Sequence, residues 1–166
     1  DAGVPLRTVH IGGDEVSHGV WMASPKIRRL MEKEGLSNGH EIHAWFVRRM
    51  AGILAGHGLK IAGWQEVALG RSEEYDREVS PRVAYINTWD TLGDRDSLAY
   101  EFANRGYPVV LTNVRNFYLD MYYAANDREP GALWGGTVDE FSGFACQPFN
   151  NYSSARTDQN GLSNDF

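Results

Sequence analysis

Short apolar runs alternate with longer segments of helical periodicity along most of the chain. Four runs of β-branched or apolar residues are too short for helices and predict strands, over residues 8–11, 60–64, 83–87 and 109–112. The segments between these runs predict helices, over residues 24–34, 38–57 and 95–104. Because helices separate the strands and no hairpin signal lies between them, the pattern predicts a parallel sheet.

The last part of the chain loses this periodicity. From about Tyr122 onward Gly, Pro, Asn, Ser and aromatic residues predominate, which predicts long loops with one short helix near 139–144. The pair Asp139-Glu140 in this region is interpreted as a solvated pair or as the start of a helix.

Polar or aromatic side chains of types common in catalytic sites follow each of the four predicted strands. They are Asp14 and Glu15, then Trp64 and Glu66, then Trp89 and Asp90, and finally Asn113, Tyr118 and Asp120. In a (β/α)8 barrel, active sites are assembled at the carboxyl ends of the strands. The predicted fold class is therefore α/β, part of a (β/α)8 TIM barrel with about four central strands, their helices and long βα loops.

Four strands are half of such a barrel, which usually needs about 250 residues. Residues 1–166 are therefore expected to form a partial catalytic barrel domain that lacks the early strands and the final strand. The chain begins at Asp1 without a methionine and reaches a strand almost at once, so a fragment of a longer protein is expected. Oligomeric state is left open.

Composition and charge narrow the classes of partner. Acidic residues number 22 against 16 lysines and arginines, and the net charge of -6 argues against nucleic acid. No run approaches the roughly 20 apolar residues of a transmembrane helix. The single cysteine, Cys146, excludes an internal disulfide and argues against a cysteine-rich zinc site. No cofactor is expected.

Asp14-Glu15 is the strongest candidate for chemistry, because an apolar strand and two glycines precede it. A carboxylic acid whose pKa is raised by an apolar pocket can protonate a leaving oxygen, while a second carboxylate nearby stays charged. Glycoside hydrolysis uses this division of roles. Tryptophans offer flat surfaces to a sugar ring, and Trp64, Trp89 and Trp134 are expected in loops or at strand ends.

The string His10-Ile11-Gly12-Gly13-Asp14-Glu15 resembles the signature of glycoside hydrolase family 20, the β-N-acetylhexosaminidases. Further landmarks of that family follow in the same order, namely Gly63-Trp64-Gln65-Glu66, Trp89, Tyr118-Leu119-Asp120 and Trp134. The resemblance runs from His10 to about Phe149. It departs from the family after Phe149, where the usual tryptophan and glutamate of the final strand have no match, and in the absent early strands, which usually bring an arginine to the sugar.

The resemblance implies hydrolysis of terminal, non-reducing β-linked N-acetylglucosamine or N-acetylgalactosamine from glycans or chitooligosaccharides. In that family the acetamido oxygen of the substrate, not a protein group, attacks the anomeric carbon, and configuration is retained. Glu15 would be the general acid and base. Asp14 would hold the acetamido N–H, and Tyr118 would donate its hydroxyl to the acetamido oxygen.

The resemblance also implies the residues that bind the sugar. Trp64, Trp89 and Trp134 would enclose the acetamido methyl and the ring, and Asp120 would bind a sugar hydroxyl. His10 is a further substrate-binding candidate, with a core or supporting role as the alternative. A periplasmic or secreted location is expected on the same ground.

Other interpretations stay open. A carbohydrate-binding module without catalysis would keep the aromatic residues but would not need Glu15. A metal site would group His10, Asp14, Glu15 and His18, although this spacing matches no zinc motif. His18, His40 and His43 are expected on the surface or on helices, Trp45 in the core, and Trp21 is undecided. A solvated helix face is expected for Arg28, Arg29, Glu32, Lys33 and Glu34.

Overall fold

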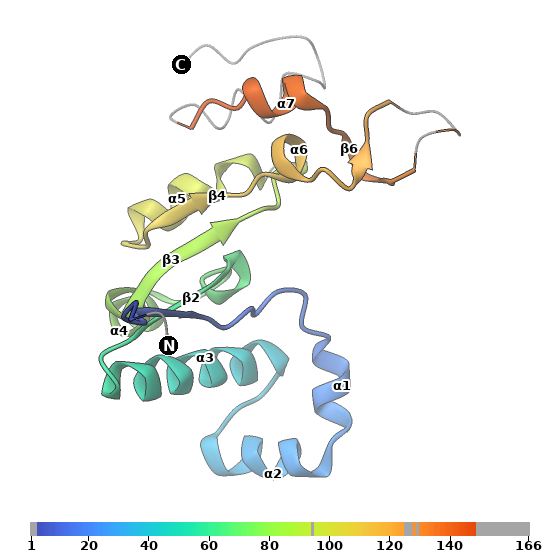
Figure 1. Ribbon diagram of the computed structural model, residues 1–166. Helices are drawn as coiled ribbons and strands as arrows, with labels where there is room; N and C mark the ends of the chain where they lie inside the picture. The colour runs from blue at the N-terminus through green and yellow to red at the C-terminus, as the bar shows by residue number, and fades with distance from the viewer. Residues whose placement is uncertain (1–2, 94, 125–127, 129, 149–166) are drawn as a thin grey trace. The chain divides into compact units, whose positions relative to one another are not determined.

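The computed structural model describes residues 3–93, 95–124, 128 and 130–148. The chain divides into two compact units (Figure 1). The first comprises residues 1–86 and 105–108, and the second comprises residues 87–104 and 109–166. No helix among the described residues is long and apolar enough to cross a membrane.

Strands β1 (Thr8–His10), β2 (Lys60–Trp64) and most of β3 (Val83–Thr88) belong to the first unit, and β2 lies between the other two. β1 and β2 run parallel, with His10 opposite Ala62. All three strands fall within one residue of their predicted bounds. Buried side chains of the unit's core lie on and around these strands, including Ile61, Ala62, Val67, Val83 and Ile86.

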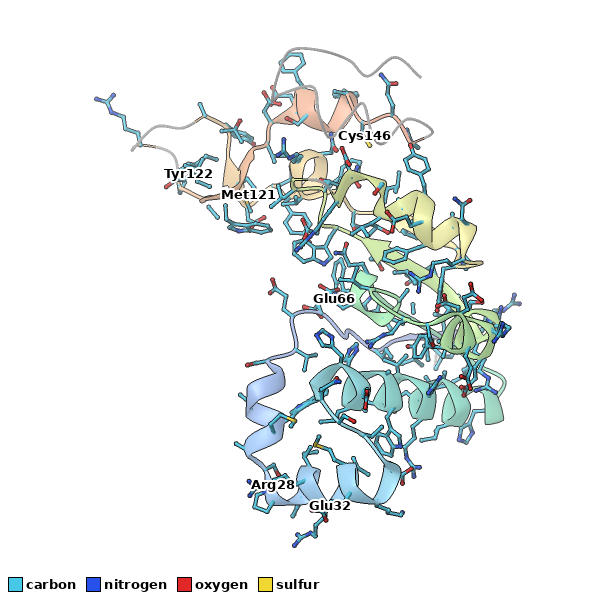
Figure 2. The ribbon with its side chains drawn as sticks, turned by 180° about the vertical axis from the view of Figure 1, so that it is seen from behind. Arg28, Glu32, Glu66, Met121, Tyr122 and Cys146 are labelled. Carbon is cyan, nitrogen blue, oxygen red and sulfur yellow. The ribbon has the colours of Figure 1, made fainter. Side chains whose placement is uncertain are left out.

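Three helices separate β1 from β2. They are α1 (His18–Ala23), α2 (Pro25–Glu34) and α3 (Gly39–Gly56). Gly35 ends α2 in the left-handed conformation, and the Asn38 side chain begins α3 by accepting a hydrogen bond from the Glu41 N–H at 3.0 Å. α2 and α3 confirm the prediction, whereas α1 was not predicted. The polar face predicted on α2 is confirmed as exposed, and Figure 2 labels Arg28 and Glu32 on it.

The buried stripe of α3 differs from the one that its apolar residues predict. Its buried residues are Gly39, His43, Val47 and Ala51, which recur every four residues, together with the apolar Ile42. Trp45, predicted as a core residue, is half-buried instead, and the Arg49 guanidinium carbon lies 5.5 Å from its ring centroid. Phe46 and Ile53 are exposed instead, at 40% and 48%, so α3 carries more apolar side chains than it buries.

Helix α4 (Glu73–Val79) joins β2 to β3, between the short 3-10 helices η1 (Gln65–Val67) and η2 (Ser80–Arg82). The Ser72 side chain caps its first turn by accepting from the Tyr75 N–H at 3.3 Å. Tyr75 and Val79 are buried one turn apart. This helix was not predicted from the sequence.

A buried ion pair fastens residues 105–108 to α4. The Asp76 carboxylate accepts hydrogen bonds from Arg105 Nε and Nη2 at 2.8 and 2.9 Å and from the Tyr107 hydroxyl at 2.7 Å. Arg105 Nη2 also donates to the Ala68 carbonyl at 2.7 Å. Burial and the contact with Asp76 raise the pKa of Tyr107, so its hydroxyl remains a donor. Asp76 thus joins α4 to residues 105–107, and Arg105 extends the link to Ala68.

We expect Asp76→Ala to lower the free energy of unfolding by about 3 kcal/mol, because it leaves a largely buried guanidinium without its counter-charge. Urea denaturation of the full-length protein measures this. Glu73→Ala on the same helix is the control, since the Glu73 side chain is 95% exposed and its contact with Arg77 is long, at 4.0 Å. Equal stability of the two variants would contradict the role of Asp76.

The second unit contains the end of β3 and β4 (Val109–Leu111), with η3 (Arg95–Ser97) and α5 (Leu98–Asn104) between them. The Thr112 N–H donates to the Thr88 carbonyl at 2.9 Å, which aligns the ends of the two strands. β4 and the helix predicted over 95–104 are confirmed, although the first residues of that helix adopt 3-10 geometry.

Beyond β4 the second unit has more regular structure than predicted. α6 (Val114–Phe117), β5 (Met121–Tyr122), β6 (Ala132–Thr137) and α7 (Glu140–Phe144) follow, and β5 pairs with β6. Val114, Met121 and Val138 form the buried cluster that holds them. The prediction of loops from Tyr122 onward is therefore wrong for β6. Asp139 caps α7 by accepting from the Ser142 N–H at 2.8 Å, which confirms the helix start.

Candidate active site

The turn that carries Asp14 and Glu15 is an extension of the β1–β2 ladder. The Ile11 N–H donates to the Ala62 carbonyl at 2.8 Å, and the Trp64 N–H donates to the Gly12 carbonyl at 3.0 Å. Gly63 permits this close approach, because a Cβ there would lie 2.6 Å from Val67 Cγ2 and 3.0 Å from the Gly12 oxygen. The turn is therefore anchored to the end of β2 through its first glycine.

Left-handed backbone conformations shape this turn. Gly12 and Gly13 have φ values of 70° and 95°, and Glu15 has a φ of 45°. Among the residues that the structure describes, Glu15 is the only non-glycine residue with positive φ. Such a conformation costs on the order of 1 kcal/mol or more and persists where surrounding structure enforces it. The Asp14 and Glu15 side chains are both exposed.

His10 and Trp64 lie together at the ends of β1 and β2. Their ring centroids are 5.7 Å apart at an angle of 75°, and the Tyr85 ring lies 6.3 Å from His10. The Gly12 N–H donates to His10 Nδ1 at 3.2 Å, so the ring supports the glycine turn. His10 is exposed and so does not lie in the core, whereas its hydrogen bond to Gly12 agrees with the supporting role that was the other part of the alternative.

Three aromatic rings cluster in the second unit. Trp89, Tyr118 and Trp134 have centroids 5.9–6.4 Å apart. The Trp89 and Tyr118 planes are 19° apart, while Trp134 stands nearly perpendicular to both, at 80° and 82°. Two parallel rings and a third across them form an aromatic corner that suits a small apolar group.

Short elements position these three rings. Trp89 follows β3, and its carbonyl accepts from the Val114 N–H at 2.9 Å, at the start of α6. Tyr118 ends α6. Trp134 lies in β6 and is 53% exposed, so the expectation that it lies in a loop or at a strand end is wrong. Asp120 is exposed in the turn between α6 and β5.

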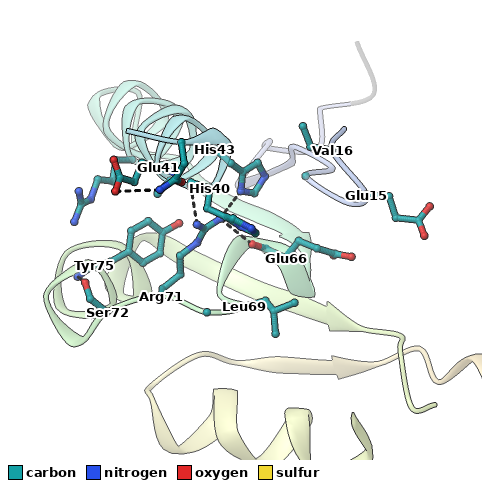
Figure 3. Close-up of a pocket in the computed structure, with 15 residues that line it drawn as sticks. Glu15, Val16, His40, Glu41, His43, Glu66, Leu69, Arg71, Ser72 and Tyr75 are labelled. Atoms are coloured by element: carbon teal, nitrogen blue, oxygen red, sulfur yellow. Dashed lines mark hydrogen bonds between the residues drawn. The ribbon is translucent and has the colours of Figure 1, made fainter. Parts of the chain in front are cut away.

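A pocket of about 810 Å³ lies wholly within the first unit, and sequence reasoning missed most of its lining (Figure 3). Glu15 and Glu66 contribute to its wall, together with His43, Arg71 and Tyr75. Guanidinium groups flank the Tyr75 ring, with the Arg48 and Arg71 carbons 5.2 and 5.3 Å from its centroid. One sequence signal could have identified part of this lining. Ser72 followed by two glutamates is typical of a helix start, and this helix places Tyr75 in the pocket wall.

Burial in this pocket has electrostatic consequences. It raises the pKa of Tyr75 to about 12, since a buried phenolate would be poorly solvated. Burial also lowers the pKa of Arg71, whose guanidinium nevertheless stays charged near neutral pH. The Tyr75 hydroxyl therefore remains protonated and donates to the Val67 carbonyl at 2.9 Å.

The predicted site residues divide between the two units. His10, Asp14, Glu15 and Trp64 belong to the first, and Trp89, Tyr118, Asp120 and Trp134 to the second. Within the described part of the chain, no three His, Cys, Asp or Glu side chains could hold a metal ion together, and the side chain of His18 is not described.

Comparison with known proteins gives concordant matches. The model of the catalytic domain of glycosyl hydrolase family 20 matches residues 2–163. A beta-hexosaminidase of Vibrio vulnificus is 32% identical over 81% of this chain and 16% of that protein. Beta-hexosaminidase B of Pseudoalteromonas piscicida is 30% identical over 84% of this chain and 17% of that protein. The chain thus spans about a sixth of the length of these relatives.

A solved structure gives a similar result. The crystal structure of a beta-N-acetylhexosaminidase from Bacteroides fragilis NCTC 9343 superposes with a TM-score of 0.62 and 29% sequence identity. The match covers 80% of this chain and 25% of that one. Together with the family match, it confirms the predicted fold class, an α/β chain that is part of a (β/α)8 barrel.

Proposed function

Because the chain belongs to glycoside hydrolase family 20, we propose that its full-length protein is a β-N-acetylhexosaminidase. The protein removes terminal β-linked N-acetylglucosamine or N-acetylgalactosamine from glycans or chitooligosaccharides. The observation that carries this proposal is the anchored glycine turn, which presents Asp14 and Glu15 side by side at the end of β1. A periplasmic or secreted location belongs to the same proposal.

The proposed roles follow the chemistry of each side chain. Glu15 protonates the glycosidic oxygen and then activates water as a general base. Asp14 accepts a hydrogen bond from the acetamido N–H. It also stabilises the positive charge that develops on the acetamido group as its oxygen attacks the anomeric carbon. The side chains of both residues are exposed, as contact with a substrate requires.

The aromatic residues are proposed to bind the N-acetyl group and the sugar. Tyr118 donates its hydroxyl to the acetamido oxygen, while Trp89 and Trp134 pack against the acetamido methyl. The cluster of these three rings, with Trp134 nearly perpendicular to Trp89 and Tyr118, supports this proposal. Trp64 with its neighbour His10 contacts the sugar, and Asp120 accepts a hydrogen bond from one of its hydroxyls.

Release of an aryl leaving group from aryl β-N-acetylglucosaminide and β-N-acetylgalactosaminide by the full-length protein tests the proposal. We expect turnover of at least one of the two substrates without added metal. Binding of N-acetylglucosamine without any hydrolysis would instead indicate a carbohydrate-binding module. Activity that a chelator abolishes and metal restores would indicate a metal-dependent hydrolase.

A further inference from the structure

Arg71 links two segments that flank the glycine turn. Its Nη1 donates to the His40 carbonyl at 3.0 Å, at the start of α3, and its Nη2 donates to the Glu66 carbonyl at 3.1 Å, just after β2. Its Nε contacts the Val67 carbonyl at 3.4 Å. The guanidinium thus holds the start of α3 to the end of β2, with Tyr75 packed against it.

The same guanidinium fixes the orientation of a buried histidine. Arg71 Nη2 is hydrogen-bonded to Nδ1 of His43, whose side chain is only 3% exposed. Arginine has donors only, so Nδ1 must accept and the proton of the imidazole lies on Nε2. Trp21 of α1 stacks on the ring, with centroids 6.4 Å apart at 26°. His43 thus lies on a helix, one of the two places expected for it, with its side chain buried rather than on the surface.

His43 lies directly behind the catalytic turn. A Cβ added to Gly13 would be 3.4 Å from His43 Nε2 and 3.2 Å from Val67 Cγ2, so the imidazole packs against the backbone next to Asp14. Gly13 and Glu15 both have left-handed backbones, which need support from their surroundings. The Glu15 side chain extends away from Arg71 and His43 (Figure 3). The two residues therefore support the turn from behind.

We propose that His43 and Arg71 are positioning residues for Glu15: Arg71 orients the imidazole, and the imidazole holds the Gly13 backbone so that the general acid meets the leaving oxygen. This inference rests on the proposed function, because it presumes that Glu15 is the acid. A shift of about 1 Å in a reacting group can cost on the order of 100-fold in rate. Displacing the turn is thus expected to affect proton transfer from Glu15 more than binding of the sugar.

The test uses the full-length protein and a series of aryl β-N-acetylglucosaminides whose leaving groups differ in pKa. We expect His43→Ala to lower kcat about 10- to 100-fold on poor leaving groups and much less on activated ones, with KM within about twofold. His43→Gln should restore most of the activity, since its amide can accept from Arg71 and donate on its other side. Arg71→Lys should also lower kcat more on poor leaving groups than on activated ones. A lysine ammonium lacks the planar guanidinium that bonds to His43 and to the backbone carbonyls at the same time.

Two controls separate positioning from general damage. His57→Ala changes an exposed histidine at the other end of α3 and should leave all rates unchanged. In a Glu15→Gln background, His43→Ala should cost much less than it does in the wild type, because no acid remains to be positioned and only Asp14 still depends on the turn. Equal losses across the leaving-group series, or additive losses in the double variant, would overturn the inference. If His43→Ala does not fold, the rates of His43→Gln and Arg71→Lys across the same series decide the question. An inactive wild-type protein would overturn the proposed function itself.

Discussion

Replacing Glu15 by glutamine in the full-length protein is expected to lower kcat/KM by about 10²- to 10⁴-fold on glycosides with poor leaving groups. Glutamine is nearly isosteric but cannot donate an acidic proton to the glycosidic oxygen. Activated aryl groups leave with little protonation, so their cleavage step should lose far less. Steady-state measurements across a leaving-group series test this. The kcat/KM of Glu15→Gln should fall more steeply with rising leaving-group pKa than that of the wild-type protein.

The chain offers a matched control for this substitution. Glu140 belongs to the other Asp-Glu pair, and it is exposed in the first turn of α7, where Asp139 serves as the helix cap. Glu140→Gln should leave the rates unchanged. If Glu15→Gln reduced all substrates by the same factor, Glu15 would not be the general acid.

The second large effect concerns the substrate rather than the protein. We expect the full-length protein to hydrolyse 2-acetamido-2-deoxy-β-glycosides at least about 10³-fold faster than the matching 2-hydroxyl glycosides. In the proposed mechanism the acetamido oxygen is an intramolecular nucleophile, and well-placed groups of this kind reach effective molarities of about 10⁵ M or more. Comparison of kcat/KM for the two classes of substrate measures this ratio. The anomeric configuration of the first product shows whether configuration is retained.

Two further observations bear on the same mechanism. A stable ring analogue of the oxazoline should bind about 10²-fold more tightly than substrate or better, and Asp14→Asn should weaken both this inhibition and turnover. A covalent adduct on Asp14 or Glu15, or comparable rates on plain glucosides, would show that a protein carboxylate is the nucleophile. The general-acid role of Glu15 would survive an adduct on Asp14 or comparable rates on plain glucosides, but not an adduct on Glu15 itself. The role of the acetamido group would survive none of these results.

The four strands of the barrel were predictable because each is a short apolar run bounded by glycine or polar residues. β2, for example, has the predicted bounds, Lys60–Trp64. The longer helices α2 and α3 were predictable for a related reason, since each spans enough turns for helical periodicity to be distinct. These elements have local signals that tertiary contacts reinforce.

The elements that the sequence analysis missed are short. α1, α4 and α6 have 6, 7 and 4 residues, too few for a periodic pattern to stand out. β6 contains two adjacent glycines and exposes Leu133 and Trp134, so it lacks the alternation of a half-buried strand. Its pairing with β5 is a tertiary contact that no local pattern encodes.

In the candidate site, too, residues within a local sequence motif were predicted and residues brought together only by folding were not. Asp14 and Glu15 stand in a contiguous motif and were identified from sequence, whereas His43 and Arg71 are separated by 28 residues and have no shared motif. Only the folded chain brings the imidazole and the guanidinium together behind Gly13. Sequence reasoning therefore identified the residues proposed to contact the substrate and missed those that support them.

The left-handed backbone of Glu15 also has an evolutionary meaning. Glycine adopts such a φ without strain, and asparagine tolerates it better than glutamate does. Mutation and selection for folding alone would therefore drift toward those two residues at position 15. A glutamate in this strained conformation is what the chemical role proposed for Glu15 predicts, because function can favour a residue that stability alone would not. In descendants that retain this fold but have lost hydrolysis, position 15 is where relaxed selection would first become visible.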